Sequence, residues 1–168
     1  MRQLFKNLPE EQLKTTTSFA HGEVLPITQV PIESFSKKKW EDGYGLLPDG
    51  KDNRIYAPLD GVIAEISGNG NAYRIKGDNG LEVFIHLGVD TDDLGEPYFE
   101  IKSVPGQIVK TGDIIGVMDV AGVTRIHKCP VSYLLILSGE EVRLIKHHAM
   151  VDETDDGFFW CAQVDHLI

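Results

Sequence analysis

The sequence is short of positive charge and of cysteine. Sixteen Lys and Arg residues stand against 26 Asp and Glu residues, which gives a formal net charge of −10 over 168 residues. This charge repels a phosphate backbone or an anionic bilayer, so nucleic acid is not expected as a partner. Cys129 and Cys161 are the two cysteines, without C-x-x-C spacing. They predict neither a disulfide framework nor a structural zinc site, and we expect no metal.

Long apolar runs are also missing. No stretch approaches the about 18 consecutive apolar residues of a membrane-spanning helix. The first residues, Met1 to Lys6, lack the apolar region and the small-residue cleavage site of a secretory signal. We therefore expect a cytoplasmic protein.

Glycine and proline are plentiful and scattered. The 17 glycines and 8 prolines separate short apolar runs, a pattern typical of many brief strands. The length fits one domain, and the predicted class is all-β, a sandwich or barrel. Strands are expected over residues 54–57, 62–67, 72–76, 81–87, 107–110, 114–118, 131–137, 142–146 and 158–164.

The N-terminal stretch has a different composition. Leu4, Phe5 and Leu8 form a short apolar group, and Pro9 halts any helix that starts there. A membrane-surface anchor is one interpretation, but the apolar face is under two turns long, which favours a flexible tail. We therefore predict a flexible segment over residues 1–18 and a folded domain over residues 19–168.

The most informative segment is a predicted β-hairpin over residues 69–90. Alternation places Leu81, Val83, Ile85 and Leu87 toward the core, and Glu82, Phe84 and His86 on the other face. A loop at residues 78–79 sets Asn71 opposite His86, whereas a loop at residues 79–80 sets Tyr73 there. Both registers keep Asn71 and His86 on one face; a three-residue loop would reverse this unless Gly80 forms a bulge.

The exposed His86 can carry chemistry. A neutral imidazole, with an ordinary pKa of about 6.5, is a nucleophile and a leaving group at cellular pH. Gly88 and Asp90 follow it with open backbone and a carboxylate. These features suit reversible phosphoryl transfer, although a surface histidine without a task is the simpler interpretation, and spacing alone does not decide between them.

A longer pattern adds a family resemblance. Residues 78–91, Asp-Asn-Gly-Leu-Glu-Val-Phe-Ile-His-Leu-Gly-Val-Asp-Thr, closely resemble the active-site motif of glucose-class enzyme IIA proteins of the bacterial sugar phosphotransferase system. The resemblance covers about residues 19–168. It continues through Gly22-Glu23-Val24, Val30-Pro31, Phe35-Ser36, Asp42-Gly43, residues 57–61, residues 106–113 and Pro130-Val131.

The resemblance implies a fold and a function. The fold would be an antiparallel β-sandwich of the duplicated hybrid motif type. His86 would accept a phosphoryl group from the carrier protein HPr and pass it to the IIB domain of a sugar permease, with no cofactor. Asp90 matches a family position near the active histidine and is expected to help bind or orient partner groups. The protein would meet a membrane only through the permease.

One position departs from the family pattern. The family normally carries a second active-site histidine where this chain has Asn71. An amide can donate a hydrogen bond to the phosphoryl group but cannot become cationic, so we expect slower onward transfer. The alternative is a regulatory binding module, whose phosphorylation state controls a transporter or an enzyme. The same substitution leaves only one histidine for a zinc site shared with a partner.

A second departure lies in residues 32–43. Family members usually carry an acidic residue at the position of Ile32 and a small apolar residue at that of Lys39, both near the partner-docking face. Three lysines and Trp40 form either a solvated loop or a reshaped docking surface. The residues expected to contact a partner are Phe35, Lys39, Trp40 and Phe84.

Overall fold

Short apolar runs between glycine turns fold into antiparallel strands, as the sequence predicted. The computed structural model describes residues 8–9, 12–36 and 42–164. In this part of the chain the strands are β1 (Gly22–Pro26), β2 (Gly43–Pro48), β3 (Arg54–Tyr56), β4 (Gly61–Ile66), β5 (Ala72–Gly77), β6 (Glu82–His86), β7 (Phe99–Ile101), β8 (Ile108–Val109), β9 (Ile114–Met118), β10 (Ser132–Ile136), β11 (Glu141–Leu144), β12 (Met150–Val151) and β13 (Phe159–Ala162).

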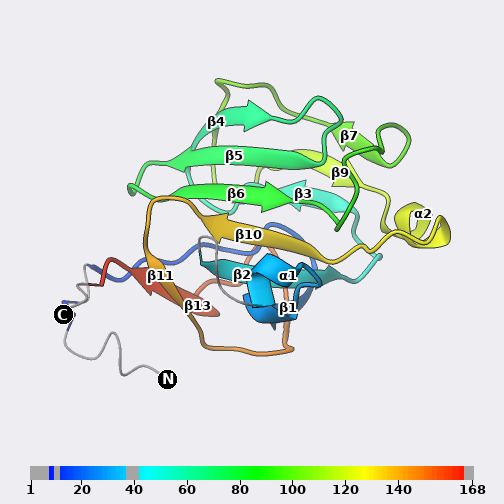
Figure 1. Ribbon diagram of the computed structural model, residues 1–168. Helices are drawn as coiled ribbons and strands as arrows, with labels where there is room; N and C mark the ends of the chain where they lie inside the picture. The colour runs from blue at the N-terminus through cyan, green and yellow to red at the C-terminus, as the bar shows by residue number, and fades with distance from the viewer. Residues whose placement is uncertain (1–7, 10–11, 37–41, 165–168) are drawn as a thin grey trace.

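The strands build a sandwich. An eight-stranded sheet has the order β12-β1-β2-β10-β6-β5-β4-β8, and its described pairs are antiparallel. Figure 1 shows the three-stranded sheet β3-β9-β7 behind it and the pair β11-β13 at one end. The predicted class, an antiparallel all-β sandwich, is confirmed.

The core fills the space between the sheets. Ile75, Val83 and Ile85 of the large sheet join Phe99 and Ile115 of the small one in a single buried cluster. Alternation explains which side chains enter it, because residues two apart on a strand share a face. His86 alternates with Ile85 and therefore points away from this core.

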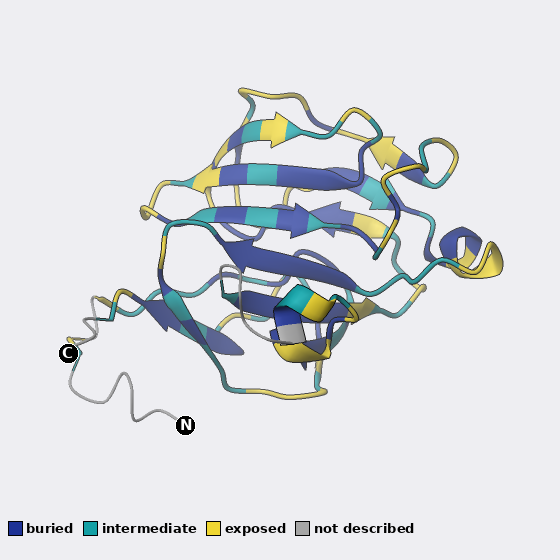
Figure 2. Cartoon of the chain, viewed as in Figure 1, coloured by how far each residue is buried: buried dark blue, intermediate teal, exposed yellow. Residues whose placement is uncertain are grey.

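A second, smaller apolar cluster lies on the outer face of the large sheet. It contains Ile27, Val30, Phe35, Tyr133 and Leu135. The 3-10 helix η3 (Ile27–Gln29) and the helix α1 (Glu33–Ser36) cover this face beside β10, whose five residues are all buried (Figure 2). β10 is therefore apolar on both faces.

Several elements were absent from the sequence prediction. Four buried residues in a row begin β2, because the core lies on one side of it and the outer cluster on the other, so alternation is lost. β1 was missed in the same region. β7 and β12 are too short to show a period. Helix α2 (Val120–Arg125), whose N-cap Asp119 accepts from Gly122 N–H, was also missed.

The hairpin register differs from both predicted registers. Ala72 lies opposite His86, and Lys76 lies opposite Glu82. The loop has three residues, 78–80, because Gly77 N–H bonds Leu81 O across it and Gly80 takes a φ of +89°. Asn71 therefore does not share a face with His86 through the ladder, as a two-residue loop would have required.

The predicted boundary at residue 18 falls inside folded structure. Lys14 exchanges two backbone hydrogen bonds with Cys161, and Thr17 N–H bonds Pro58 O. Thr16 and Ser18 are buried. A flexible segment reaching to residue 18 is therefore not what the structure shows, because Lys14, Thr15 and Thr17 hydrogen-bond to distant parts of the domain. Residues 1–7, 10 and 11 lie outside the described part.

The helices of the described residues are short. None is long and apolar enough to cross a bilayer.

Candidate functional site

The site forms where β6 ends beside β10. His86 is the last residue of β6 and pairs with Tyr133 on β10, so the two rings leave the sheet on the same face. They stack with centroids 5.1 Å apart and an angle of 3° between their planes. The imidazole is 13% exposed. The stack fixes the orientation of the imidazole plane, and one edge of the ring remains accessible to solvent.

The turn after β6 sets the tautomer of His86. Nδ1 lies 2.8 Å from the carbonyl oxygen of Gly88. A carbonyl only accepts, so Nδ1 carries the proton and donates it. In the neutral ring Nε2 then holds the free lone pair. Gly88 can turn its carbonyl back because its φ is +77°, a conformation that side chains rarely adopt.

A carboxylate and an amide meet at Nε2. Asp92 Oδ1 lies 3.2 Å from His86 Nε2, and Asn71 Nδ2 donates to the same oxygen at 2.8 Å. Ser67 Oγ donates to Asn71 Oδ1 at 2.8 Å, which orients the amide. The hydrogen bond from Asn71, above all, together with His86 keeps the pKa of Asp92 below its usual value. Asp92 is therefore an anion at neutral pH.

Asn71 reaches the site from the end of β5. Its backbone oxygen accepts from Leu87 N–H, and its side chain is buried, at 2% exposed. Its amide also donates to Thr91 Oγ1 at 3.2 Å. Asn71 and His86 are thus connected through Asp92, and not by sharing a face across the hairpin as both predicted registers required.

Asp90 does not lie where the sequence analysis expected a carboxylate. Its side chain is 87% exposed, and it pairs with Lys128 at 3.4 Å; its described contacts do not include His86. Asp92 takes the place beside the imidazole and was missed. The signal that could have found it is the acidic run Asp90-Thr91-Asp92-Asp93 directly after the histidine turn.

The expected partner-contacting residues fall into two groups. Phe35 is buried and packs its edge against Tyr133, with centroids 4.8 Å apart. Phe84 is half-buried beside the outer cluster, 6.0 Å from the His86 ring. Phe35 is therefore a buried member of the outer cluster, whereas Phe84 packs against that cluster and remains partly exposed. Lys39 and Trp40 lie outside the described residues.

One group of side chains away from His86 has metal-ligand chemistry. Ligand atoms of His21, Asp52 and Glu153 lie within 4.8 Å of one another. The Asp52 carboxylate already accepts from Arg54 and, at 2.6 Å, from Tyr56 Oη. His21 bonds Glu153. These contacts describe an ion-pair cluster that ties three loops together.

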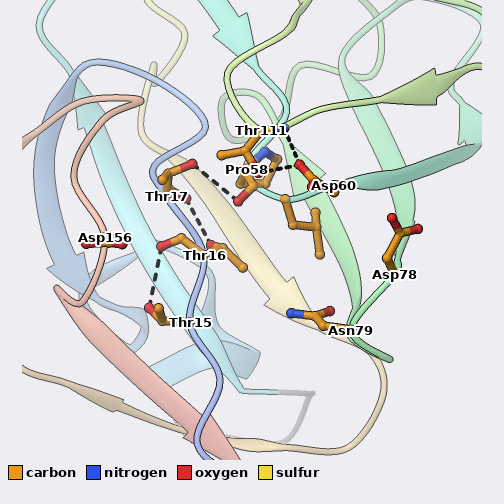
Figure 3. Close-up of a pocket in the computed structure, with 10 residues that line it drawn as sticks. Thr15, Thr16, Thr17, Pro58, Asp60, Asp78, Asn79, Thr111 and Asp156 are labelled. Carbon is orange, nitrogen blue, oxygen red and sulfur yellow. Dashed lines mark hydrogen bonds between the residues drawn. The ribbon is translucent and has the colours of Figure 1, made fainter.

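A cavity of about 330 Å³ opens at the far end of the hairpin, away from His86. Figure 3 shows Thr15, Thr16 and Thr17 on one side and Asp60, Asp78 and Asn79 on the other. The threonine hydroxyls donate to backbone carbonyls, and Asp60 accepts from Thr111. Two of the hydroxyls that line it, those of Thr15 and Thr17, therefore hold the N-terminal segment to the domain.

Comparisons with known proteins show the family of this chain. The family "phosphoenolpyruvate-dependent sugar phosphotransferase system, EIIA 1" matches residues 14–142. The chain is 35% identical over 124 residues to the PTS system glucose-specific EIIA component of Haemophilus influenzae, covering 74% of each.

Two further relatives extend the comparison. The chain is 32% identical over 124 residues to a PTS system glucose-specific EIICBA component of Staphylococcus saprophyticus, covering 74% of this chain and 18% of that protein. Among solved structures, the glucose permease IIA from Mycoplasma capricolum superposes with a TM-score of 0.73 at 22% identity, covering 89% of this chain and 94% of the other. That likeness bears on the fold.

Proposed function

The chain belongs to the EIIA 1 family of the phosphoenolpyruvate-dependent sugar phosphotransferase system, and we propose that His86 carries its phosphoryl group. A phosphocarrier role in that system follows from the family. The choice of His86 is supported by one observation above all. The Gly88 carbonyl holds the proton on Nδ1 and leaves Nε2 as the nucleophile.

The transfer step needs no group outside the two proteins. The Nε2 lone pair forms a new P–N bond while the P–N bond of the donor breaks. The electron pair of the broken bond stays on the donor imidazole, which leaves neutral when its other nitrogen carries a proton. The proton of His86 stays on Nδ1 and keeps its hydrogen bond to the Gly88 carbonyl during the step, so the phosphorylated ring carries a positive charge next to that carbonyl dipole.

Partners follow from the family and from the site's surroundings. We propose HPr as the donor and a permease IIB domain as the acceptor, which the EIICBA name of the Staphylococcus saprophyticus relative supports. The partly buried side chains that pack against the outer cluster, Phe84 and Val89 among them, form an apolar face near the imidazole, suited to protein docking. Asp90, exposed at its rim, would meet a partner's positive charge. Lys39 and Trp40 remain proposed partner contacts on the sequence alone.

Asn71 would replace the second histidine of the family in one of its tasks. Its buried amide is aimed at the space in front of Nε2 and can donate to a phosphoryl oxygen. It cannot become cationic, so we propose that onward transfer is slower than with an imidazole there. The regulatory alternative is not specifically supported by the relatives.

The test is phosphorylation from labelled phosphoenolpyruvate with enzyme I and HPr. We expect label on the unmodified protein and on His147→Ala, an exposed histidine outside the site, and none on His86→Ala. Two-bond proton–nitrogen NMR spectra should place phosphorus on Nε2 and the proton on Nδ1. Label that survives in His86→Ala, or phosphorus on Nδ1, would contradict the assignment.

A further inference from the structure

We propose that Asp92 is a carboxylate cap on the acceptor nitrogen, which leaves Nε2 when the phosphoryl group arrives and then makes phosphorylated His86 a stronger donor. The proposal deepens the function above and rests on His86 being the acceptor. Asp92 lies in the turn after β6, outside the hairpin that the sequence predicted.

The contact between Asp92 and His86 depends on a proton. Because Nδ1 donates to Gly88, the neutral ring presents a lone pair at Nε2, and Asp92 Oδ1 presents another at 3.2 Å. Two lone pairs repel, whereas a proton on Nε2 makes the contact a charge-assisted hydrogen bond. In the neutral ring the carboxylate therefore occupies the space in front of the Nε2 lone pair, which an incoming phosphoryl group must reach.

The cap can open without moving the loop. The Asp92 side chain is 84% exposed, so rotation carries it into water. The backbone around it is held separately, because Asn69 Nδ2 donates to the carbonyls of Thr91, Asp92 and Leu94. Thr91 Oγ1 in turn donates to Leu87 O at 2.6 Å. Opening then breaks only the hydrogen bond from Asn71 Nδ2 to Oδ1 and the contact between Oδ1 and His86 Nε2.

The donor released by Asp92 stays in place. Asn71 is buried, and Ser67 fixes its amide from behind. When the carboxylate leaves, Nδ2 points at the position that Oδ1 occupied, next to Nε2. A phosphoryl oxygen entering there accepts the same hydrogen bond. Oδ1 therefore marks the place of a phosphoryl oxygen in the loaded protein.

The charge of Asp92 changes the equilibrium between phosphorylated and unphosphorylated His86. A phosphoryl group carries close to two negative charges, and the displaced carboxylate remains anionic within the same turn. Like charges at this range in water-exposed surroundings cost about tenfold in an equilibrium constant. Asp92 thus disfavours the phosphorylated state and favours transfer of the group to the next protein. This effect offsets part of the slower onward transfer that we expect from Asn71.

The experiment measures the equilibrium between phosphorylated HPr and this protein, with each species separated on a native gel. Asp92→Asn removes the charge at nearly constant shape, and Asp92→Ala removes the side chain. Asp93→Asn is the matched control, because that carboxylate is one residue away, 70% exposed, and pairs with Lys128. We expect both Asp92 variants to shift the equilibrium toward phosphorylated His86 by about tenfold and to slow transfer to a IIB domain, with Asp93→Asn unchanged.

The outcomes separate this inference from the proposed function. Asp92 variants that behave like the unmodified protein and Asp93→Asn, with label still lost in His86→Ala, would overturn the cap and leave the function standing. An equal shift in Asp93→Asn would also overturn it, since general surface charge would then be the cause. Label that survives in His86→Ala would remove both.

Discussion

Replacing Gly88 with alanine should damage the site through a steric contact and not only through backbone strain. A Cβ at this position would lie 2.5 Å from Thr91 Cγ2 and 3.0 Å from the Cys129 carbonyl oxygen. Thr91 cannot move freely, because its hydroxyl donates to Leu87 O. The turn that presents the Gly88 carbonyl to His86 must therefore shift.

The expected magnitude has two parts. A left-handed φ costs an alanine about 1 kcal/mol, and forcing a methyl group into a filled site costs about 1–3 kcal/mol more. The free energy of unfolding should fall by about 2–4 kcal/mol in total. The hydrogen bond to Nδ1 is worth about 1 kcal/mol, so phosphorylation by HPr should slow by about fivefold as the tautomer preference weakens.

Gly106→Ala is the matched control. Gly106 has a φ of +88°, and nothing lies within 4 Å of a Cβ built there. Urea denaturation should therefore show a loss of only about 1 kcal/mol for this variant. The difference between the two variants isolates the contact with Thr91 from the backbone cost. Nitrogen NMR of His86 reports the tautomer separately.

The steric account would be refuted by equal losses of stability in Gly88→Ala and Gly106→Ala. A second refuting result is full retention of the Nδ1 proton in Gly88→Ala together with unchanged phosphorylation, because the carbonyl would then not control the ring.

Two further predictions concern stability. Burial by itself lowers the pKa of His21, but the hydrogen bond and charge of Glu153 and the neighbouring carboxylates outweigh it and raise the pKa above 6.5. The protonated ring therefore stabilises the folded state fully at a pH below the pKa of the unfolded chain, and this stabilisation is lost as the pH rises through the pKa of the folded state. In urea denaturation, His21→Gln should lower the free energy of unfolding by up to about 1 kcal/mol more at about pH 5.5 than at about pH 9. An equal loss at both pH values would contradict this. Tyr73 Oη is buried without a hydrogen-bond partner among the described residues. Tyr73→Phe should therefore leave the free energy of unfolding, measured by urea denaturation, unchanged or raise it by up to about 1 kcal/mol. A clear loss of stability would show that the hydroxyl has a hydrogen-bond partner.

Local pattern predicted much of this protein. Alternation along β6 buried Val83 and Ile85 and turned His86 outward, and the residues Asp78-Asn79-Gly80 predicted the hairpin turn. The motif after the turn indicated the family. These features depend on residues a few positions apart, so the order of side chains along the chain is enough to determine them.

The tertiary structure decided the composition of the site. Tyr133 stacks on His86 only because β10 pairs with β6 in one register, far along the chain. The positive φ values of Gly88 and Asp90 turn the chain so that Asp92 reaches the imidazole and Asp90 does not. Alternation limits a strand register only to shifts of two residues, and the loop geometry and the choice of partner strand depend on packing between segments far apart in the sequence. The sequence by itself determined that one histidine faces outward, whereas the folded chain determined which carboxylate, amide and ring surround it.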